Sequence, residues 1–242
     1  ISHRRTHTRV PVDKFSPLRP ARTIKSFGRI QGRLTESQET AIDTLWPTYG
    51  LEHHLDKLSA ATATVLEIGF GNGESFTQQA AAAPDQLFIG VEVYLPGVGS
   101  CLKLAANQQL SNILLARKDA HDIVEHVMPK NEAAIIDRIQ IFFPDPWPKK
   151  RHHKRRLVQP EFIEDLLRIL KPGGQIHVAT DWQQYAIHAL EVLSSISSLS
   201  NCSPAGDYMP RPDYRPLTKF EQRGIRLGHG VWDIVFTKKN ER

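Results

Sequence analysis

Short, nearly continuous runs of valine, isoleucine, leucine and phenylalanine recur after residue 63, and longer segments compatible with helices separate them. Apolar runs of this length are typical of parallel strands that are buried on both faces of a sheet. The predicted strands are Thr64–Ile68, Leu87–Val93, Asn112–Ala116, Arg138–Phe143, Gln175–Thr180 and, after a Pro-rich loop, Val231–Thr237. The predicted helices are a stretch at 35–58 that Pro47 interrupts, then Ser75–Ala83, Gly97–Leu110, Asp122–Val127, Pro160–Leu170 and 182–198. This alternation predicts an α/β fold with a doubly wound, mostly parallel sheet.

The chain divides into a basic N-terminal segment and one folded unit. Residues 1–33 contain nine Lys and Arg against the single acid Asp13, with prolines at 11, 17 and 20 and no sustained hydrophobic period. This composition predicts a flexible arm. Residues 34–242 are predicted to form a single domain, because a chain of 242 residues suffices for one core and an extension. Within it, the Lys-Pro-Gly-Gly sequence at 171–174 predicts the end of a helix and a turn into the next strand.

A second basic run lies at 149–156, where six of eight residues are Lys or Arg and none is acidic. Positive charge segregated in this way predicts a polyanionic partner such as nucleic acid. Directly before the run, Pro144-Asp145-Pro146-Trp147 places an acid and an aromatic ring at the end of a predicted strand. Such a pair can hold a flat nucleobase while the basic run holds its phosphate backbone. The alternative for the run is a solvated charged face.

A glycine-rich turn follows the first predicted strand, in the sequence Glu67-Ile68-Gly69-Phe70-Gly71-Asn72-Gly73. Gly69 and Gly71 allow the backbone to approach a ligand, and Glu74 stands where a dinucleotide fingerprint has its third glycine. Glu92 ends the next strand, where an acid can accept both ribose hydroxyls, and Asp119 follows the third, placed for an adenine amino group. Acids after three successive strands predict S-adenosylmethionine as the cofactor; for Glu67 the alternative is a role in orienting the loop or capping the next helix.

Seven segments of the chain resemble the bacterial tRNA (guanine-N7)-methyltransferases of the TrmB family. Among them, the Pro-Asp-Pro-Trp and Thr-Lys-Phe-Glu sequences are specific in combination, whereas the glycine turn is common to methyltransferases in general. One departure is Pro148 after the tryptophan, which we expect to change the stiffness of the loop. The segments are Leu66–Gly71, Gly90–Val93, Pro96–Gly99, Phe142–Trp147, Lys154–Arg156, Ala179–Trp182 and Thr218–Gly224.

The resemblance implies a Rossmann-like class I methyltransferase that transfers the methyl group of S-adenosylmethionine to N7 of a guanine in tRNA, in the variable loop. It implies that Asp145 is the active-site acid and that Glu67, Glu92 and Asp119 hold the cofactor, which Asp145 also touches. The residues expected to contact the RNA guanosine are Lys149, Asp181, Thr218, Lys219, Phe220 and Glu221. Those expected to contact the RNA backbone are Arg151, Lys154, Arg155 and Arg156.

The residues themselves fit this chemistry. Guanine N7 carries a lone pair and no proton, so positioning can supply most of the acceleration and no general base is needed. A carboxylate aimed at the base stabilises the cationic product ring and can accept hydrogen bonds from guanine N1 and N2. Asp145 and Asp181 follow the fourth and fifth strands, on the edge that carries the glycine turn; helix capping is their alternative role.

Three other functions remain open on the sequence alone. The first is a methyltransferase acting on an exocyclic amino group of another nucleic acid or of protein, because Asp-Pro-Trp is similar to the Asp-Pro-Pro-Tyr loop of those enzymes. The others are an NAD-dependent oxidoreductase, which Glu74 disfavours, and a non-catalytic RNA-binding module. No metal is expected, since the histidines lack zinc-site spacing, and no membrane association, since no apolar run is long enough. Two distant cysteines favour the cytoplasm, and we expect a monomer more than a homodimer.

Overall fold

The computed structural model describes residues 32–122, 134–218 and 230–240, together with 221, 222, 226 and 228. The predicted arm at 1–33 lies outside the described residues apart from Gly32 and Arg33, and so does most of the predicted helix at 122–127.

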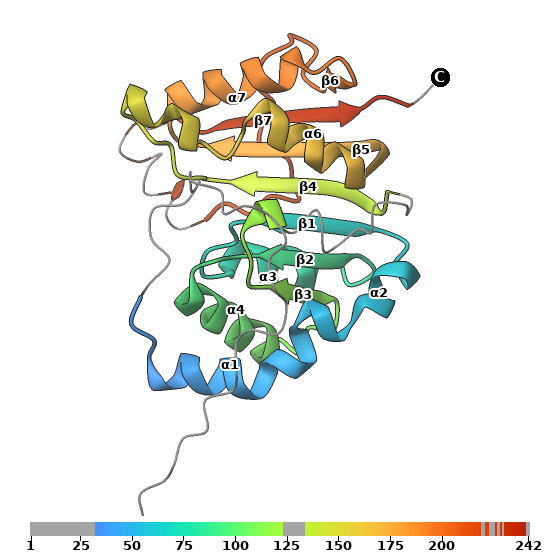
Figure 1. Cartoon of the computed structure of the whole chain (residues 1–242), viewed down its shortest axis with the longest axis vertical. Coiled ribbons are helices and arrows are strands. Elements are labelled where there is room, and N and C mark those ends of the chain that lie inside the picture. The colour runs from blue at the N-terminus through green and yellow to red at the C-terminus, as the bar shows by residue number, and fades with distance from the viewer. Residues whose placement is uncertain are drawn as a thin grey trace, which may run out of the picture.

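The described strands form one seven-stranded sheet in the order β3-β2-β1-β4-β5-β7-β6 (Figure 1). Strands β1 to β5 run parallel, whereas β7 is antiparallel to both β5 and β6. The strand order reverses between β1 and β4, and a crevice at the carboxyl ends of the strands is expected at such a point. The fold prediction is therefore confirmed. The strands are β1 Thr64–Ile68, β2 Leu87–Val91, β3 Ile113–Ala116, β4 Ile136–Phe142, β5 Leu170–Thr180, β6 Leu199–Asn201 and β7 Trp232–Lys238.

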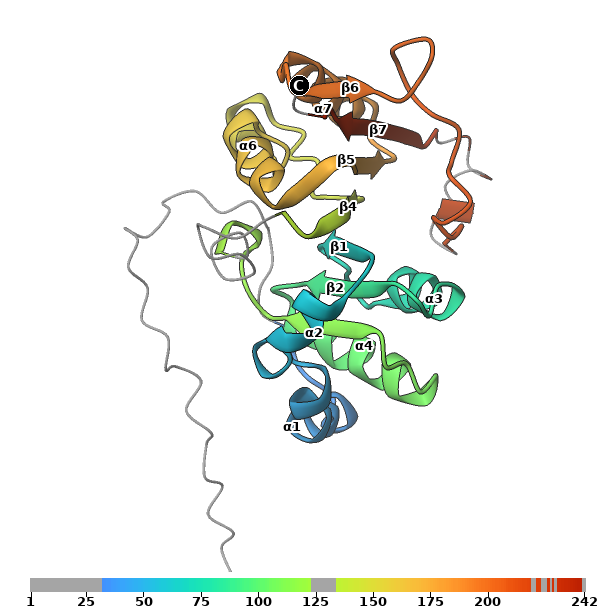
Figure 2. The ribbon, with the colours of Figure 1, turned by 90° about the vertical axis from the view of Figure 1, so that its right-hand side faces the viewer.

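Helices cover both faces of the sheet, and each face has its own apolar core. Helices α1 (Glu36–Tyr49), α3 (Glu74–Ala82) and α4 (Leu95–Asn107) pack on β1, β2 and β3 from one side. Helices α2 (Leu55–Ala60), α6 (Pro160–Ile169) and α7 (Gln183–Ser195) pack on the other side. Figure 2 shows α3 and α4 on one side of the sheet and α6 on the other. None of the helices in the described part of the chain is long and apolar enough to cross a membrane.

Three local predictions are corrected. The first helix does not break at Pro47; α1 runs through it to Tyr49, and a 3₁₀ turn at Leu51–His53 separates it from α2. The Lys171–Gly174 sequence is not a turn before the strand but a bulge within β5, since Leu170 already pairs with Ile136 and Gln175 with Arg138. Strand β6 lies in a segment that was predicted to be a loop. It is a strand because it pairs with β7, and its own sequence does not indicate that pairing.

Candidate active site

The glycine turn after β1 lies at the carboxyl edge of the sheet. Gly69 and Gly71 have φ of 82° and 58°, a region that disfavours residues with a side chain. A Cβ atom placed on either glycine would meet no other atom within 4 Å. Gly97 in the first turn of α4 lies against the Gly71 carbonyl, where a Cβ would collide. The turn is thus open toward the edge of the sheet and packed against α4 on its other side. We call Gly69 and Gly71 in this turn the glycine cradle.

Glu92 directly follows β2 and closes this cradle. One carboxylate oxygen accepts a hydrogen bond from the Gly71 amide (2.9 Å), and the other accepts from the amides of Val93 (2.7 Å) and Tyr94 (2.8 Å). Burial raises the pKa of Glu92, while these three hydrogen bonds oppose the rise. A carboxylate offers about four acceptor positions, so one remains for a ligand hydroxyl.

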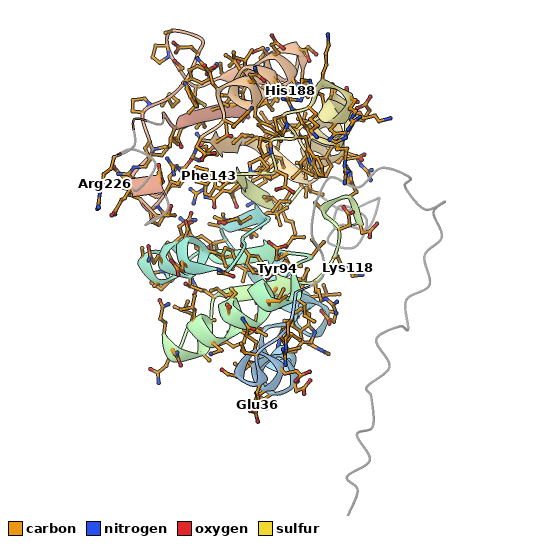
Figure 3. The ribbon with its side chains drawn as sticks, turned by 90° about the vertical axis from the view of Figure 1, so that its left-hand side faces the viewer. Glu36, Tyr94, Lys118, Phe143, His188 and Arg226 are labelled. Carbon is orange, nitrogen blue, oxygen red and sulfur yellow. The ribbon has the colours of Figure 1, made fainter. Side chains whose placement is uncertain are left out.

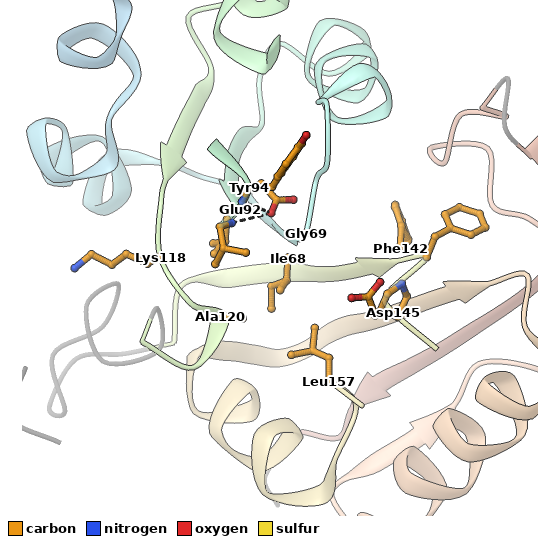
Figure 4. A pocket seen from close by; sticks show the side chains of 13 residues that line it. Ile68, Gly69, Glu92, Tyr94, Lys118, Ala120, Phe142, Asp145 and Leu157 are labelled. Carbon is orange, nitrogen blue, oxygen red and sulfur yellow. Dashed lines mark hydrogen bonds between the residues drawn. The ribbon is translucent and has the colours of Figure 1, made fainter. Parts of the chain in front are cut away.

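A cavity of about 420 Å³ lies between the glycine turn and the end of β4. Its volume falls within the roughly 300–1,000 Å³ of small-molecule sites. Figure 4 shows Glu92 and Tyr94 on one wall, Leu157 opposite, and Asp145 and Phe142 at one end. Figure 3 shows this edge with Tyr94, Lys118 and Phe143 on it. The lining comprises Ile68, Gly69, Val91, Glu92, Val93, Tyr94, Lys118, Ala120, Phe142, Phe143, Pro144, Asp145 and Leu157.

Asp145 reaches the cavity from a strained loop after β4. Phe143 and Trp147, on either side of it, have φ of 49° and 44°, which costs a residue with a side chain about 1 kcal/mol or more. Two arginines hold the loop: the guanidinium of Arg155 stacks 3.6 Å from the centre of the Trp147 ring, and Arg156 Nε donates to the Pro146 carbonyl (3.1 Å). Strain maintained by specific contacts around an exposed acid is typical of functional sites.

Arg156 thereby departs from its expected role. Its side chain is only 4% exposed and also lies over the ring of Tyr185, with 5.4 Å from guanidinium to ring centre. In this structure the last cation of the basic run supports the Asp145 loop from inside, and its contact with RNA phosphates stays a prediction that the burial disfavours. Arg151 and Lys154, by contrast, are exposed, and so is Lys149 at the start of the run's 3₁₀ turn (Lys150–Arg155).

Asp119 lies beside the cavity without lining it; its neighbours Lys118 and Ala120 do. Its Oδ1 accepts from the backbone N–H of His121 (3.1 Å), which caps the helical turn that starts at Ala120. The prediction that Asp119 binds the adenine amino group remains a prediction.

Glu67 lies inside β1 rather than at its end, and its side chain does not line the cavity. The carboxylate is buried beneath the glycine turn and accepts from Gln79 Nε2 of α3 (3.1 Å). Burial raises the pKa of Glu67 to about 8. The hydrogen bond from Gln79 and the positive charge of Arg138 lower the pKa and so oppose part of this rise. These contacts favour the alternative reading, in which Glu67 orients the loop, over direct contact with a cofactor.

Replacing this acid has a pH-dependent effect on stability. The folded pKa of Glu67 lies above its unfolded value, so its contribution to stability is full below pH 4.5 and is lost as the pH rises toward 8. We expect Glu67→Gln, which cannot ionise, to gain melting temperature relative to the wild type as the pH rises through this window. Thermal melts of both chains check it, with Glu74→Gln as the exposed control; a difference independent of pH would contradict the assignment.

The other expected guanosine contacts fall into four cases. Asp181 follows β5 directly, and the Phe143 amide donates to the Ala179 carbonyl (2.7 Å), so Asp181 and Asp145 leave adjacent strand ends. Lys219 and Phe220 lie outside the described residues. Glu221 is 3% exposed and both its oxygens pair with Arg215 (2.8 Å each), which disfavours a direct contact with guanosine; that contact stays a prediction. Thr218 is half-buried, and its hydroxyl accepts from the Glu221 amide (3.1 Å).

Comparisons with known proteins place this site in a family. Residues 61–234 match the family model described as "Putative methyltransferase". The chain is 51% identical over 223 residues to the tRNA (guanine-N(7)-)-methyltransferase of Shewanella amazonensis, covering 90% of this chain and 92% of that protein. It is 50% identical over 227 residues to the same-named protein of Serratia proteamaculans, covering 91% and 94%. The chain belongs to the tRNA (guanine-N7)-methyltransferase family.

Solved structures of lower identity share the fold of this family member. The 16S rRNA methyltransferase KamB superposes with a TM-score of 0.57 at 15% identity, over 79% of this chain and 95% of that one. The aminoglycoside resistance methyltransferase NpmB1 gives a TM-score of 0.52 at 17% identity, over 78% and 94%. Both confirm a class I methyltransferase architecture.

The structure also adds residues that the sequence did not single out. Tyr94 and Leu157 line the cavity, and Gly32 lies against Tyr94 and Pro96, where a Cβ would collide. A signal for Tyr94 existed, since it follows the strand-ending Glu92 by two residues. Leu157 comes directly after the basic run, and only the path of that run places it at the cavity.

Proposed function

We propose that this protein is an S-adenosylmethionine-dependent tRNA (guanine-N7)-methyltransferase. The observation that carries the proposal is the Asp145 loop, an exposed acid on a strained turn at the end of a cavity that also holds Glu92 and the open glycine cradle. Family relatives that match about nine-tenths of the chain carry this activity in their names. The target is the variable-loop guanosine of tRNA, and the enzyme works in the cytoplasm as a monomer.

The cavity residues fit the cofactor. Gly69 and Gly71 leave room for its amino-acid portion, and the remaining acceptor position of Glu92 suits a ribose hydroxyl. Apolar side chains such as Val91 and Leu157 suit the flat faces of adenine, with Asp119 beside them for its amino group. Bound there, S-adenosylmethionine supplies a sulfonium-activated methyl group.

Guanine N7 would supply the electron pair for the new bond to the methyl carbon, and the sulfur of the donor would take the electron pair of the carbon–sulfur bond that breaks. No proton moves, because N7 has none. Asp145 positions the base through its N1 and N2 protons and stabilises the positive charge that develops on the ring. Asp181, from the adjacent strand end, assists in holding the guanosine, together with Lys149 and Thr218.

Transfer of labelled methyl from S-adenosylmethionine to unmodified tRNA, followed by digestion and identification of the nucleoside, tests the proposal. We expect 7-methylguanosine. A methylated exocyclic amino group would support the rival amino-group methyltransferase, and transfer to protein alone would exclude a tRNA enzyme.

Neutralising two cations of the basic run separates phosphate binding from loop support. We expect Lys154→Gln to flatten the salt dependence of tRNA binding by about 0.7–0.9 log units per lost phosphate contact. Arg156→Gln should leave the slope unchanged and lower turnover, because the buried guanidinium holds Pro146 rather than phosphate. Affinities across a salt series and single-turnover rates measure both; equal slope changes would contradict the division.

The arm is the second candidate contact with phosphates. Its end at Gly32 lies on Tyr94 and Pro96, at the rim of the cavity, so the preceding basic residues are attached close to the substrate side. We expect deletion of residues 1–20 to weaken tRNA binding and flatten its salt dependence, while cofactor affinity survives. Identical slopes for the truncated and full chains would mean that the deleted residues touch no phosphate.

A further inference from the structure

A row of buried polar side chains crosses the sheet on the face that carries α3. Glu67 of β1, Gln140 of β4 and His177 of β5 are partners in register. Asp233 of β7 pairs with Ala179, two residues beyond His177 along β5. All four are at most 3% exposed. Four polar groups at neighbouring core positions are costly unless every one is hydrogen-bonded, so the row calls for a physical explanation.

Glu67 and Gln140 are hydrogen-bonded to Gln79 of α3, whereas His177 and Asp233 are hydrogen-bonded to the segment that precedes β7. Asp233 accepts from Arg215 Nε (2.6 Å) and Nη2 (2.8 Å), and Arg215 simultaneously binds both oxygens of Glu221. Arg215 is 1% exposed and uses four of its five N–H donors in two bidentate pairs. A lysine cannot reproduce this geometry, because its ammonium is a single point charge.

His177 fixes the orientation of Asp233 from the other side. Its Nε2 lies 2.7 Å from Asp233 Oδ1, and its Nδ1 lies 3.0 Å from the hydroxyl of Tyr214. Burial lowers the pKa of His177 and raises that of Tyr214 to about 12, so the ring is neutral and the phenol keeps its proton. A carboxylate only accepts, so Nε2 donates to Asp233 and Nδ1 accepts from Tyr214.

Arg215, which binds the Asp233 end of the row, also lies near the active site. Arg215 also lies 5.9 Å from the ring centre of Phe142 and 5.7 Å from that of Phe143, and both rings line the cavity. Glu221, held by Arg215, donates its backbone N–H to Thr218 Oγ1 and so fixes the hydroxyl of the expected substrate segment. Gln222 N also donates to the Thr218 carbonyl (2.9 Å), so two backbone amides bind Thr218.

We propose that Arg215 is a positioning residue for methyl transfer, which fixes Glu221, and through the Glu221 amide the hydroxyl of Thr218, by pairing at once with Glu221 and with Asp233. This inference rests on the proposed function. Glu221 acts through Arg215 rather than on the guanosine, and Asp233 with His177 anchors Arg215 to the sheet.

A double-mutant cycle tests the assignment, with Arg215→Lys, Glu221→Gln and the double variant assayed well below their melting temperatures. We expect each single change to lower kcat/KM for tRNA by about 10- to 100-fold, the range for a misplaced substrate contact, with unchanged cofactor affinity. The double variant should lose little more than the worse single variant, because both residues act through one contact. Losses that multiply would mean that Glu221 touches the substrate independently and would overturn the proposal, as would full activity of a folded Arg215→Lys.

A matched control and a second measurement separate positioning from general stability. Lys171→Gln breaks the ion pair with Asp137 (2.9 Å), near the amino ends of β4 and β5, and should lower the melting temperature without altering kcat or KM. Hydrogen exchange of the Glu221 amide should accelerate in Arg215→Lys and stay unchanged in Lys171→Gln. Hydrogen exchange can be measured whether or not the enzyme is active. Unchanged protection of the Glu221 amide in Arg215→Lys would refute the positioning role. A wild type that makes no 7-methylguanosine would refute the proposed function alone.

Discussion

Asp145→Ala is expected to lose about 10²- to 10³-fold in single-turnover rate, the usual cost of removing one preorganised charge from a reacting centre. The acid lines the end of the cavity on a loop strained at Phe143 and Trp147, so its position is fixed before substrate arrives. Cofactor affinity should change much less than the rate, because the main role assigned to Asp145 is on the base, whereas Glu92 is assigned to the cofactor alone. Rapid-quench kinetics and calorimetry on the same preparation measure the two quantities.

Asp145→Asn refines this result. The amide keeps one acceptor for the guanine N–H groups but carries no charge, so it should retain part of the rate if hydrogen bonding matters more than charge. Asp56→Ala, an exposed acid on α2, is the control and should behave as the wild type. A near-normal rate for Asp145→Ala would refute the assignment of this residue to the chemistry.

Glu92→Ala is expected to weaken S-adenosylmethionine binding by about 1–3 kcal/mol, or roughly 5- to 150-fold in dissociation constant. The substitution removes the proposed ribose acceptor and also leaves the amides of Gly71, Val93 and Tyr94 without their acceptor. Binding of tRNA should stay near normal, because the basic run at 149–156 leads into Leu157, on the opposite wall of the cavity. Calorimetry for the cofactor and filter binding for tRNA give the comparison.

Two further variants keep this test decisive if the alanine variant is poorly folded. Glu92→Gln retains one acceptor oxygen and should show an intermediate loss. Glu74→Ala removes an exposed acid from the first turn of α3, beside the glycine cradle, and should bind the cofactor normally. Equal affinities for wild type and a folded Glu92→Ala chain would exclude Glu92 as a cofactor contact.

The sequence predicted the sheet well, because its central strands are continuous apolar runs that only a buried parallel sheet explains. It also brought together Gly69, Glu92 and Asp145, since each lies within three residues of a strand's end and parallel strands end at one edge. What it missed depends on pairing across the chain. Strand β6 has only three residues and takes its order from β7.

The roles of charged residues were harder to predict than their location. Arg156 ends a run of solvent-seeking cations, and only the fold shows its guanidinium inside, on the Pro146 carbonyl. Glu221 belongs to a sequence with the residue variety of a binding loop, yet its partner Arg215 is six residues earlier and buried. Burial of a charge is set by tertiary contacts, and the local sequence does not encode them.

The most direct test of the central claim, that the enzyme methylates guanine N7, uses tRNA transcribed with 7-deazaguanosine in place of guanosine. This base keeps N1 and N2 for Asp145 but has carbon at position 7 and therefore no lone pair there. Labelled methyl incorporation and tRNA affinity are measured side by side for the ordinary and the substituted transcript. The account predicts that the substituted tRNA still binds and receives no methyl group; equal incorporation into both transcripts would contradict it.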